Sequence, residues 1–393
     1  MIKNDISKLL SYIEKHKYYG YDPYDIKETD WYLKINNKHL KDIFDNLNND
    51  FAKELRDIFN IKPQLNNKAL ALFGLAYLNL YEKTLQKIYL KKAIEISKLL
   101  LKQANYNFKG ICWGYPFKWK SGNYLFEKNT PSIVVTVNVG KFFLKLYKIS
   151  KNPKYLKICK SITKFIIKNL HITKYKNNIC FSYTPFDTYQ IHNANLMGAE
   201  FLSEIGRILH NQKLLLIARK ATYFTINQQN KDGSIYYYAK NSSKIAPTHL
   251  DIYHSGFEIR SLVRLYENLK DFKIKNAFLK YLRFFIYQYI INYCIPKLGP
   301  KIKNYETDIV DIHGFSEALL TLTFTQKYKN NKLLIKKIYK WGTKNIKNSN
   351  GSFKYRWIRK NNETKTIDIA YMRWGQAWSF YALTKVYKDL NAN

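Results

Sequence analysis

The stretch Phe181-Ser-Tyr-Thr-Pro-Phe-Asp-Thr-Tyr-Gln-Ile-His-Asn-Ala-Asn195 leads directly into an apolar helical pattern over residues 196–209. The chain passes here from a Pro-containing turn into the start of a predicted helix. Backbone N–H groups are unpaired at a helix start, and the helix dipole is positive there. The polar side chains gathered in this stretch are therefore expected to be either helix caps or functional groups.

The same succession of an aromatic loop and an apolar helix returns along the chain. Helical patterns begin near Asn66, Pro131, Ile191, Leu250, Thr307 and Ile367. The interval is about 60 residues, which indicates an internal repeat. Further helices with basic faces are predicted to start near Gln86, Pro153, Gln212, Asp271 and Asn331. Loops such as 110–115, 178–183, 232–238 and 350–355 place turn residues before alternating aromatics, a pattern typical of short β-hairpins.

These repeats predict an all-α protein with an (α/α)6 toroid, in which inner and outer helices alternate and short β-hairpin loops gather at one mouth. Two unmatched helical patterns, residues 2–16 and 39–59, precede the repeats, and a single one, residues 367–390, ends them. We therefore expect one domain over residues 1–393, closed by pairing of the N- and C-terminal helices. An open helical-repeat scaffold is the alternative.

The composition predicts a folded and strongly basic protein. Of the 393 residues, 46% are hydrophobic and 16% are aromatic, which is sufficient for a sizeable core. The formal net charge of +37 favours polyanionic partners. Acidic oligo- or polysaccharide is the expected partner. The lysines are spread over the whole chain, so we expect no specific nucleic-acid binding, and peripheral association with an anionic membrane stays open.

The cysteines and the apolar segments narrow the class of protein further. The four cysteines, Cys112, Cys159, Cys180 and Cys294, have no C-x-x-C spacing, so neither a zinc ribbon nor a disulfide framework is expected. No apolar run reaches the ~18 residues that cross a bilayer, and the N-terminal residues lack an apolar signal core. We expect a cytoplasmic protein without a metal or other cofactor.

In a closed toroid, the residues that follow each aromatic loop should project into one central cavity. They combine the same polar residue types with aromatic rings at the same phase of the repeat. The candidates for catalysis are Tyr183, His192, Asp251, His254, Asp311 and His313. The candidates for substrate binding are Trp113, Tyr115, Asn138, Asp187, Asn193, Asn195, Tyr238, Tyr371, Arg373 and Trp374.

Several candidates also have a purely structural explanation. Asp251 could cap a helix, and Asp187 could close an Asx turn. His254 and His313 could be core histidines with satisfied hydrogen bonds, and Arg373 could neutralise a buried aspartate. The recurrence of similar residues at one phase of the repeat favours a functional site over these separate explanations.

Different reactions would use different members of this set. Glycoside hydrolysis needs two carboxylates that flank the bond, which Asp187, Asp251, Asp311 and Asp368 could supply. A metal ion could use the Asp251/His254 or Asp311/His313 spacing, although no tight motif supports it.

Proton abstraction beside a carboxylate needs a base, an acid and groups that hold the carboxylate. His192 and Tyr183 are suited to be the base and the acid, and Asn193 and Arg373 to bind the carboxylate.

Residues 110–380 resemble a family of α/α-toroid proteins associated with surface-polysaccharide biosynthesis. The resemblance rests on Trp113-Gly-Tyr-Pro-Phe117, Thr130-Pro131, Phe181-Ser-Tyr-Thr-Pro185, His192-Asn-Ala-Asn195 and Arg373-Trp-Gly-Gln-Ala-Trp378. More distantly, the chain is similar to uronate lyases, glucuronyl C5-epimerases and N-acylglucosamine 2-epimerases. The resemblance implies a carbohydrate-active enzyme that epimerises an acidic (uronate) glycan or cleaves it by elimination. A glycoside hydrolase and a non-catalytic glycan-binding scaffold are the alternatives.

Overall fold

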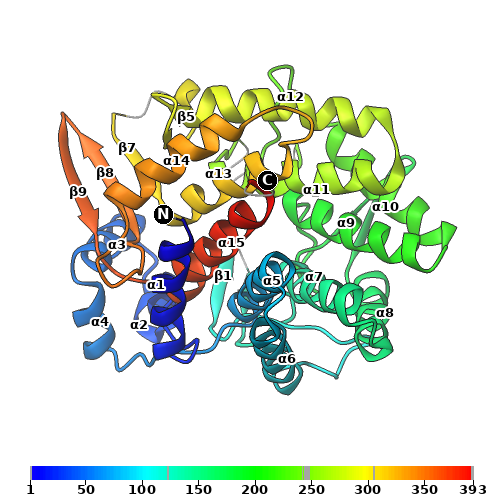
Figure 1. Ribbon diagram of the computed structural model, residues 1–393, viewed down its shortest axis with the longest axis horizontal. Coiled ribbons are helices and arrows are strands. Elements are labelled where there is room, and N and C mark those ends of the chain that lie inside the picture. The colour runs from blue at the N-terminus through cyan, green and yellow to red at the C-terminus, as the bar shows by residue number, and fades with distance from the viewer. Residues whose placement is uncertain (1, 122–123, 241, 243–247, 304–305, 391–393) are drawn as a thin grey trace.

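Two concentric layers of helices form a closed ring in the computed structural model, which describes residues 2–121, 124–240, 242, 248–303 and 306–390 (Figure 1). Each inner helix packs against the next one, and the last packs against the first. The inner helices are α5 (Asn67–Thr84), α7 (Ile133–Ser150), α9 (His192–Ile208), α11 (Ile252–Leu269), α13 (Ile312–Phe324) and α15 (Trp378–Leu390). The predicted all-α fold, an (α/α)6 toroid, is confirmed.

The outer layer consists of helices that pack on the inner helix before them in the chain. These outer helices are α6 (Lys87–Lys102), α8 (Pro153–Lys168), α10 (Gln212–Ile226), α12 (Phe272–Tyr289) and α14 (Lys332–Asn345). The N-terminal helix α1 (Ile2–Lys15) packs on the C-terminal helix α15 and so takes the sixth outer position. None of the described helices is both long and apolar enough to cross a membrane.

The inner helices are buried on nearly all sides, because they lie between the outer layer and their two inner neighbours. Small residues permit the close approach. A Cβ atom on Gly74 of α5 would overlap the ring of Phe142 of α7, and one on Gly140 of α7 would overlap the ring of Phe201 of α9. Glycine is therefore required where consecutive inner helices cross, since interiors are close-packed.

Connections from an inner to an outer helix are short, whereas those from an outer helix to the next inner helix are long and carry the strands. The strands form three hairpins and one three-stranded sheet. They are β1 (Trp119–Ser121), β2 (Tyr124–Phe126), β3 (Ile172–Tyr175), β4 (Asn178–Phe181), β5 (Ile290–Ile291), β6 (Ile295–Pro296), β7 (Asp308–Asp311), β8 (Arg356–Lys360) and β9 (Glu363–Ile367).

Three details differ from the sequence prediction. The loops 110–115, 232–238 and 350–355 contain only isolated bridges in place of complete hairpins. The helix predicted over residues 39–59 is broken at Phe51 into α3 (Lys38–Asp50) and α4 (Ala52–Ile58). The last helix begins later than residue 367, with the π-helical turn η3 (Met372–Ala377), because residues up to Ile367 form the edge strand β9.

An N-terminal segment, residues 22–61, lies beside the ring; we call it the cap. It comprises the 3-10 turn η1 (Ile26–Glu28), α2 (Asp30–Lys34), α3 and α4, all in blue in Figure 1. Ile26, Phe44 and Ile61 form a small core of its own, separate from the core of the ring. The cap is not a member of the helical repeat, so its position depends on specific contacts with the ring.

Candidate active site

A cavity of about 600 Å³ lies at the N-terminal ends of the inner helices. Each inner helical segment contributes the residue two positions after its N-cap. These residues are Lys68, Val134, Asn193, Tyr253, His313 and Arg373. Side chains in a first helical turn lean toward the helix N-terminus, and the repeat gives each inner helix a similar orientation. The same helical position therefore faces the centre of the ring each time.

The remaining wall of the cavity is aromatic and basic. Loops of the ring contribute Tyr115, Phe117, Tyr183, Tyr189 and Tyr237, and β1 contributes Trp119. The cap contributes Tyr24, Lys27, Tyr32, Leu33 and Lys41, while Lys120 comes from β1. No aspartate or glutamate is among the described residues that line the cavity. The wall of the cavity thus combines aromatic faces, which can stack on sugars, with an excess of positive charge.

His313 is a buried histidine without a hydrogen bond. Its side chain is 1% exposed, and neither ring nitrogen has a partner among the described residues. The ring stacks on Tyr253 and Trp378, with centroids 4.8 and 4.7 Å away. Burial, and then the charges of Lys68 and Arg373, hold the pKa of His313 well below its usual value. The ring is therefore neutral, and it lines the cavity with neither nitrogen bonded to a described residue.

His254 is held by a carboxylate, in contrast to His313. Its Nδ1 lies 2.6 Å from Oδ2 of Asp251, and the same oxygen lies 2.7 Å from Nε2 of His249. A carboxylate only accepts hydrogen bonds, so Nδ1 of His254 carries the proton and Nε2 has the free lone pair. Asp251 also caps α11 by accepting the backbone N–H of His254 at 2.8 Å.

The cluster of His249, Asp251 and His254 is also the one group of described residues that could hold a metal ion, since its ligand atoms lie within 4.8 Å of one another. The hydrogen bonds just described satisfy these three atoms without an ion. They orient the imidazole of His254, which lines the cavity, in the way that a catalytic carboxylate orients a histidine base.

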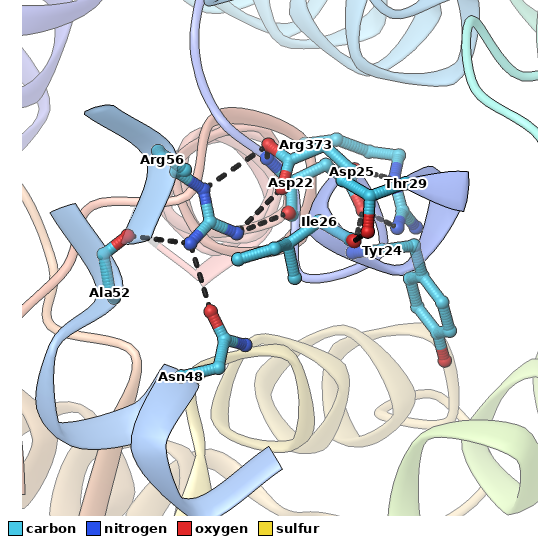
Figure 2. A network of polar contacts seen from close by, with 9 residues as sticks. All are labelled: Asp22, Tyr24, Asp25, Ile26, Thr29, Asn48, Ala52, Arg56 and Arg373. Carbon is cyan, nitrogen blue, oxygen red and sulfur yellow. Dashed lines mark hydrogen bonds and ion pairs between the residues drawn. The ribbon is translucent and has the colours of Figure 1, made fainter. Parts of the chain in front are cut away.

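Arg373 enters the cavity with its charge already compensated. Its guanidinium binds Asp22 of the cap in a bidentate pair, with Nη2 at 2.6 Å from Oδ1 and Nε bonded to Oδ2 (Figure 2). On the other side of the cap, the buried Arg56 binds Asp25, the carbonyl oxygen of Asp22 and Asn48. The Arg373–Asp22 pair connects the cap to the wall of the cavity, while the contacts of Arg56 hold the cap together.

Seven of the residues predicted from the sequence lie in the cavity wall: Tyr115, Tyr183, Asn193, His254, His313, Arg373 and Trp374. Among them, Oδ1 of Asn193 is buried and has no partner among the described residues. Burial, and then the neighbouring Tyr115, raises the pKa of Tyr183 well above its usual value. Tyr183 is therefore protonated at neutral pH, so it is suited to act as an acid and not as a base.

His192 does not lie in the cavity wall, contrary to our expectation. It occupies the first position of α9, one residue before the position that faces the cavity. Its Nδ1 lies 3.0 Å from Oγ1 of Thr225, and its ring packs near Phe224. Burial lowers the pKa of His192 to about 3. A group in this position supports the packing of α9 on α10.

The other predicted residues also have structural positions outside the wall. Asp311 caps α13 and binds Arg356 and the indole N–H of Trp374. Asp187 accepts N–H groups of Tyr183, Thr184 and Tyr189, which is the Asx-type turn considered above. Asp251 touches the cavity through His254 only.

The remaining five hold backbone or ring contacts elsewhere. Asn195 bonds to the backbone of Phe181 and Ala221, and Trp113 donates to the carbonyl of Leu100. Asn138 borders a separate void of about 20 Å³. Tyr371 packs on Tyr355, and Tyr238 packs on Tyr237.

Sequence reasoning missed Lys68 and left Tyr253 out of the site. Lys68 belongs to the first repeat, which has no aromatic loop before it, so its equivalence to His313 was hidden. The signal was available in the spacing: both residues lie two positions after a polar residue that starts an inner helix. The cap residues could not be found from the repeat, because the cap is outside it.

No protein-family model matches the sequence, and no curated protein matches it significantly. Solved structures share the fold at low sequence identity. Cellobiose 2-epimerase from Bacillus thermoamylovorans has a TM-score of 0.62, with 12% identity over 83% of this chain and 88% of its own. A D-mannose isomerase has a TM-score of 0.62, with 12% identity over 84% and 88%. A glycosyl hydrolase of family 88 from Bacteroides vulgatus has a TM-score of 0.57, with 12% identity over 81% and 91%.

These similarities agree with the expected likeness to toroid sugar enzymes at the level of the fold. The chain has the α/α-toroid architecture of these enzymes.

Proposed function

We propose that this protein is a carbohydrate-active enzyme that abstracts a proton next to the carboxylate of an acidic sugar, giving epimerisation or elimination. The observation that carries the proposal is the pair of histidines on one cavity. His254 is oriented by a carboxylate, and His313 is neutral with neither ring nitrogen bonded to a described residue. The structural neighbours named an epimerase and an isomerase support the same class of chemistry.

In this proposal His254 is the base. With its Nδ1–H donated to Asp251, the free Nε2 lone pair accepts the proton from carbon, and Asp251 stabilises the imidazolium that results. Such a positioned base contributes roughly 10²- to 10⁴-fold to the rate. We therefore assign the role of the base to His254 in place of His192, which was the candidate from the sequence.

His313 would stabilise the developing anion, and the buried tyrosines would supply the proton that neutralises it. A neutral imidazole can donate a hydrogen bond to the substrate carboxylate as negative charge grows on it. Burial keeps the pKa of Tyr253 well above its usual value, as it does for Tyr183. Both hydroxyls are thus protonated at neutral pH and can return a proton to carbon or to a leaving oxygen.

The charge of the cavity supports an acidic substrate. Six helix N-termini are directed at it, and each favours negative charge. Lys41, Lys68 and Lys120 line it without any acidic residue among the described lining. Lys27 and Arg373 line it too, but they are paired with Asp45 and Asp22. Aromatic faces such as Tyr115 and Trp374 would stack on sugar rings. An acidic surface glycan, made or modified during polysaccharide biosynthesis, fits this chemistry.

Glycoside hydrolysis has less support. The four aspartates that could have supplied the two carboxylates, Asp187, Asp251, Asp311 and Asp368, are not in the described wall. Asp368 is exposed and bonds to Asn348. A retaining or inverting hydrolase needs both carboxylates beside the bond.

The proposal is tested by incubating the protein with uronate polymers and short uronate oligomers in deuterated water. Deuterium at C5 is the expected result for an epimerase, and the absorbance of unsaturated uronate is the expected result for a lyase. His254→Gln and His313→Gln should lose activity, while His171→Gln, at an exposed site outside the cavity, should keep it. New reducing ends without either signal would instead indicate a hydrolase, and binding without any reaction would indicate a non-catalytic scaffold.

A further inference from the structure

Lys68 is a buried lysine in the cavity wall. Its side chain is 3% exposed and lies in the first turn of α5. The ammonium group lies over the rings of Phe257 and Trp378, at 5.3 and 5.2 Å from their centroids. It forms no ion pair with a described residue. Lysines are almost never this buried unless a carboxylate pairs with them, so the position needs an explanation.

The surroundings disfavour a positive charge on Lys68 in the free protein. Burial, followed by the charge of Arg373, lowers the pKa of Lys68 to about 7. Its place near the N-terminus of α5 adds to this effect, because the helix dipole is positive there.

The negative groups near Lys68 are already used by other cations. Glu317 of α13 holds Arg260 of α11 at 2.5 and 2.9 Å, and Asp22 holds Arg373. His313, the other titratable group against it, is neutral. An anion in the cavity would therefore meet Lys68 as the available deep cation.

A second lysine shows what is particular about this one. Burial also lowers the pKa of Lys145 to about 7, but that lysine is paired with Glu82 at 2.9 Å and is not part of the cavity wall. Lys145 has its counter-ion within the protein. Lys68 has none among the described residues, and it faces the space that a substrate would occupy.

We propose that Lys68 binds the anionic group of the sugar and takes up a proton from solvent as that group enters. The amine and one proton give an ammonium that pairs with the incoming carboxylate, and no covalent bond is formed. The inference rests on the proposed function and names the residue that selects an acidic over a neutral sugar. Arg373 is less suited to this role, since its guanidinium already holds Asp22 in a bidentate pair.

The position of Lys68 also fits the reaction. Phe257 and Trp378, which flank its ammonium, are the rings that His313 contacts at 5.4 and 4.7 Å. A carboxylate bound to Lys68 would thus lie beside His313, and the carbon that carries it would lie near the histidine pair. Binding of the anion and abstraction of the neighbouring proton would then take place in one part of the cavity.

The test is calorimetric and needs no turnover. D-glucuronate, D-galacturonate and D-mannuronate are titrated into the protein at pH 8, each beside its neutral parent hexose, in two buffers of different ionisation enthalpy. We expect at least one acid to bind about tenfold or more tightly than its parent, with uptake of close to one proton. Lys68→Met should remove both effects, and Lys68→Arg should keep the preference but lose the proton uptake. Lys145→Met, the matched control, should keep both.

Equal affinity for acids and parents, no binding of any of these sugars, or proton uptake that persists in folded Lys68→Met would overturn the inference. Circular dichroism establishes which variants are folded. Acid-selective binding that depends on Lys68, with no deuterium exchange, would reject the proposed reaction but support the anion site.

Discussion

Replacing Arg56 by Met should open the cap, because the contacts of Arg56 join residues 22–25 to α3 and α4 within it. Arg56 is fully buried, and its guanidinium holds Oδ1 of Asp25 at 2.6 Å, the carbonyl of Ala52 at 2.7 Å and the carbonyl of Asp22 at 2.9 Å. Met retains much of the apolar volume but leaves Asp25 buried without its cation. Removing one partner of a buried ion pair costs about 3–5 kcal/mol.

The expected loss of stability can be separated into a contribution from the unpaired charge and a contribution from packing. Burial already raises the pKa of Asp25 to about 6 in spite of Arg56, so loss of the cation should raise it further. The double variant Arg56→Met/Asp25→Asn removes the orphaned carboxyl group as well. It should therefore be less destabilised than the single variant, by roughly 2 kcal/mol, since replacement of a whole buried pair is much less costly than its disruption.

Hydrogen exchange measured by mass spectrometry is the suitable assay, because the cap has a small core of its own and can open locally. Protection of amides in residues 22–61 should fall about 100- to 1000-fold in the single variant, while the inner helices stay protected. Arg219→Met, which breaks the more exposed pair with Asp271, is the control and should cost under about 1 kcal/mol. Equal losses in the single and double variants, or no loss of protection in the cap, would refute the reasoning.

Three further outcomes are expected. Burial lowers the pKa of His192 from 6.5 to about 3. Between these pH values the unfolded chain binds one proton more than the folded protein does. The stability contributed by the neutral ring is therefore fully present above pH 6.5 and is lost as the pH falls to about 3. His192→Gln should flatten this acid slope of unfolding free energy by up to about 1.4 kcal/mol per pH unit, and an unchanged slope would contradict the assignment. Treatment with EDTA should leave activity and Tm unchanged, because hydrogen bonds satisfy the His249–Asp251–His254 cluster; loss of activity that zinc restores would show that an ion is held there. Gly74→Ala should cost about 1–3 kcal/mol in thermal unfolding, since its Cβ would overlap Phe142; a neutral effect would mean that the two helices can move apart.

The cavity wall illustrates where sequence patterns lose information about a site. Polar residues at helix starts are visible in the sequence. However, a residue that caps the helix and a residue that faces the cavity lie only one or two positions apart. Asp251 and Asp311 are N-caps, whereas Tyr253 and His313, two positions later, face the cavity. Similarly, His192 and Asn193 are adjacent, yet a step of one residue rotates a side chain by roughly 100° about the helix axis. That rotation turns His192 toward α10 and leaves Asn193 in the cavity wall.

The sequence alone determined the stack of helical hairpins, because a repeat of about 60 residues with two helical patterns in each unit can bury its apolar faces only by stacking on its neighbours. It favoured a closed toroid over an open scaffold, and the packing of α15 on α5 decided between them. It also determined the starts of most helices: the starts predicted near Asn66 and Pro131 lie within one residue of the N-caps Asn66 and Ser132. Only the tertiary structure decided which residues share the cavity. Compensation of charge depends on contacts between segments that are distant in the sequence. Arg373 pairs with Asp22 of the cap, while Lys68 has no carboxylate partner among the described residues. Spacing along a chain cannot show which of two cations has its partner inside the protein.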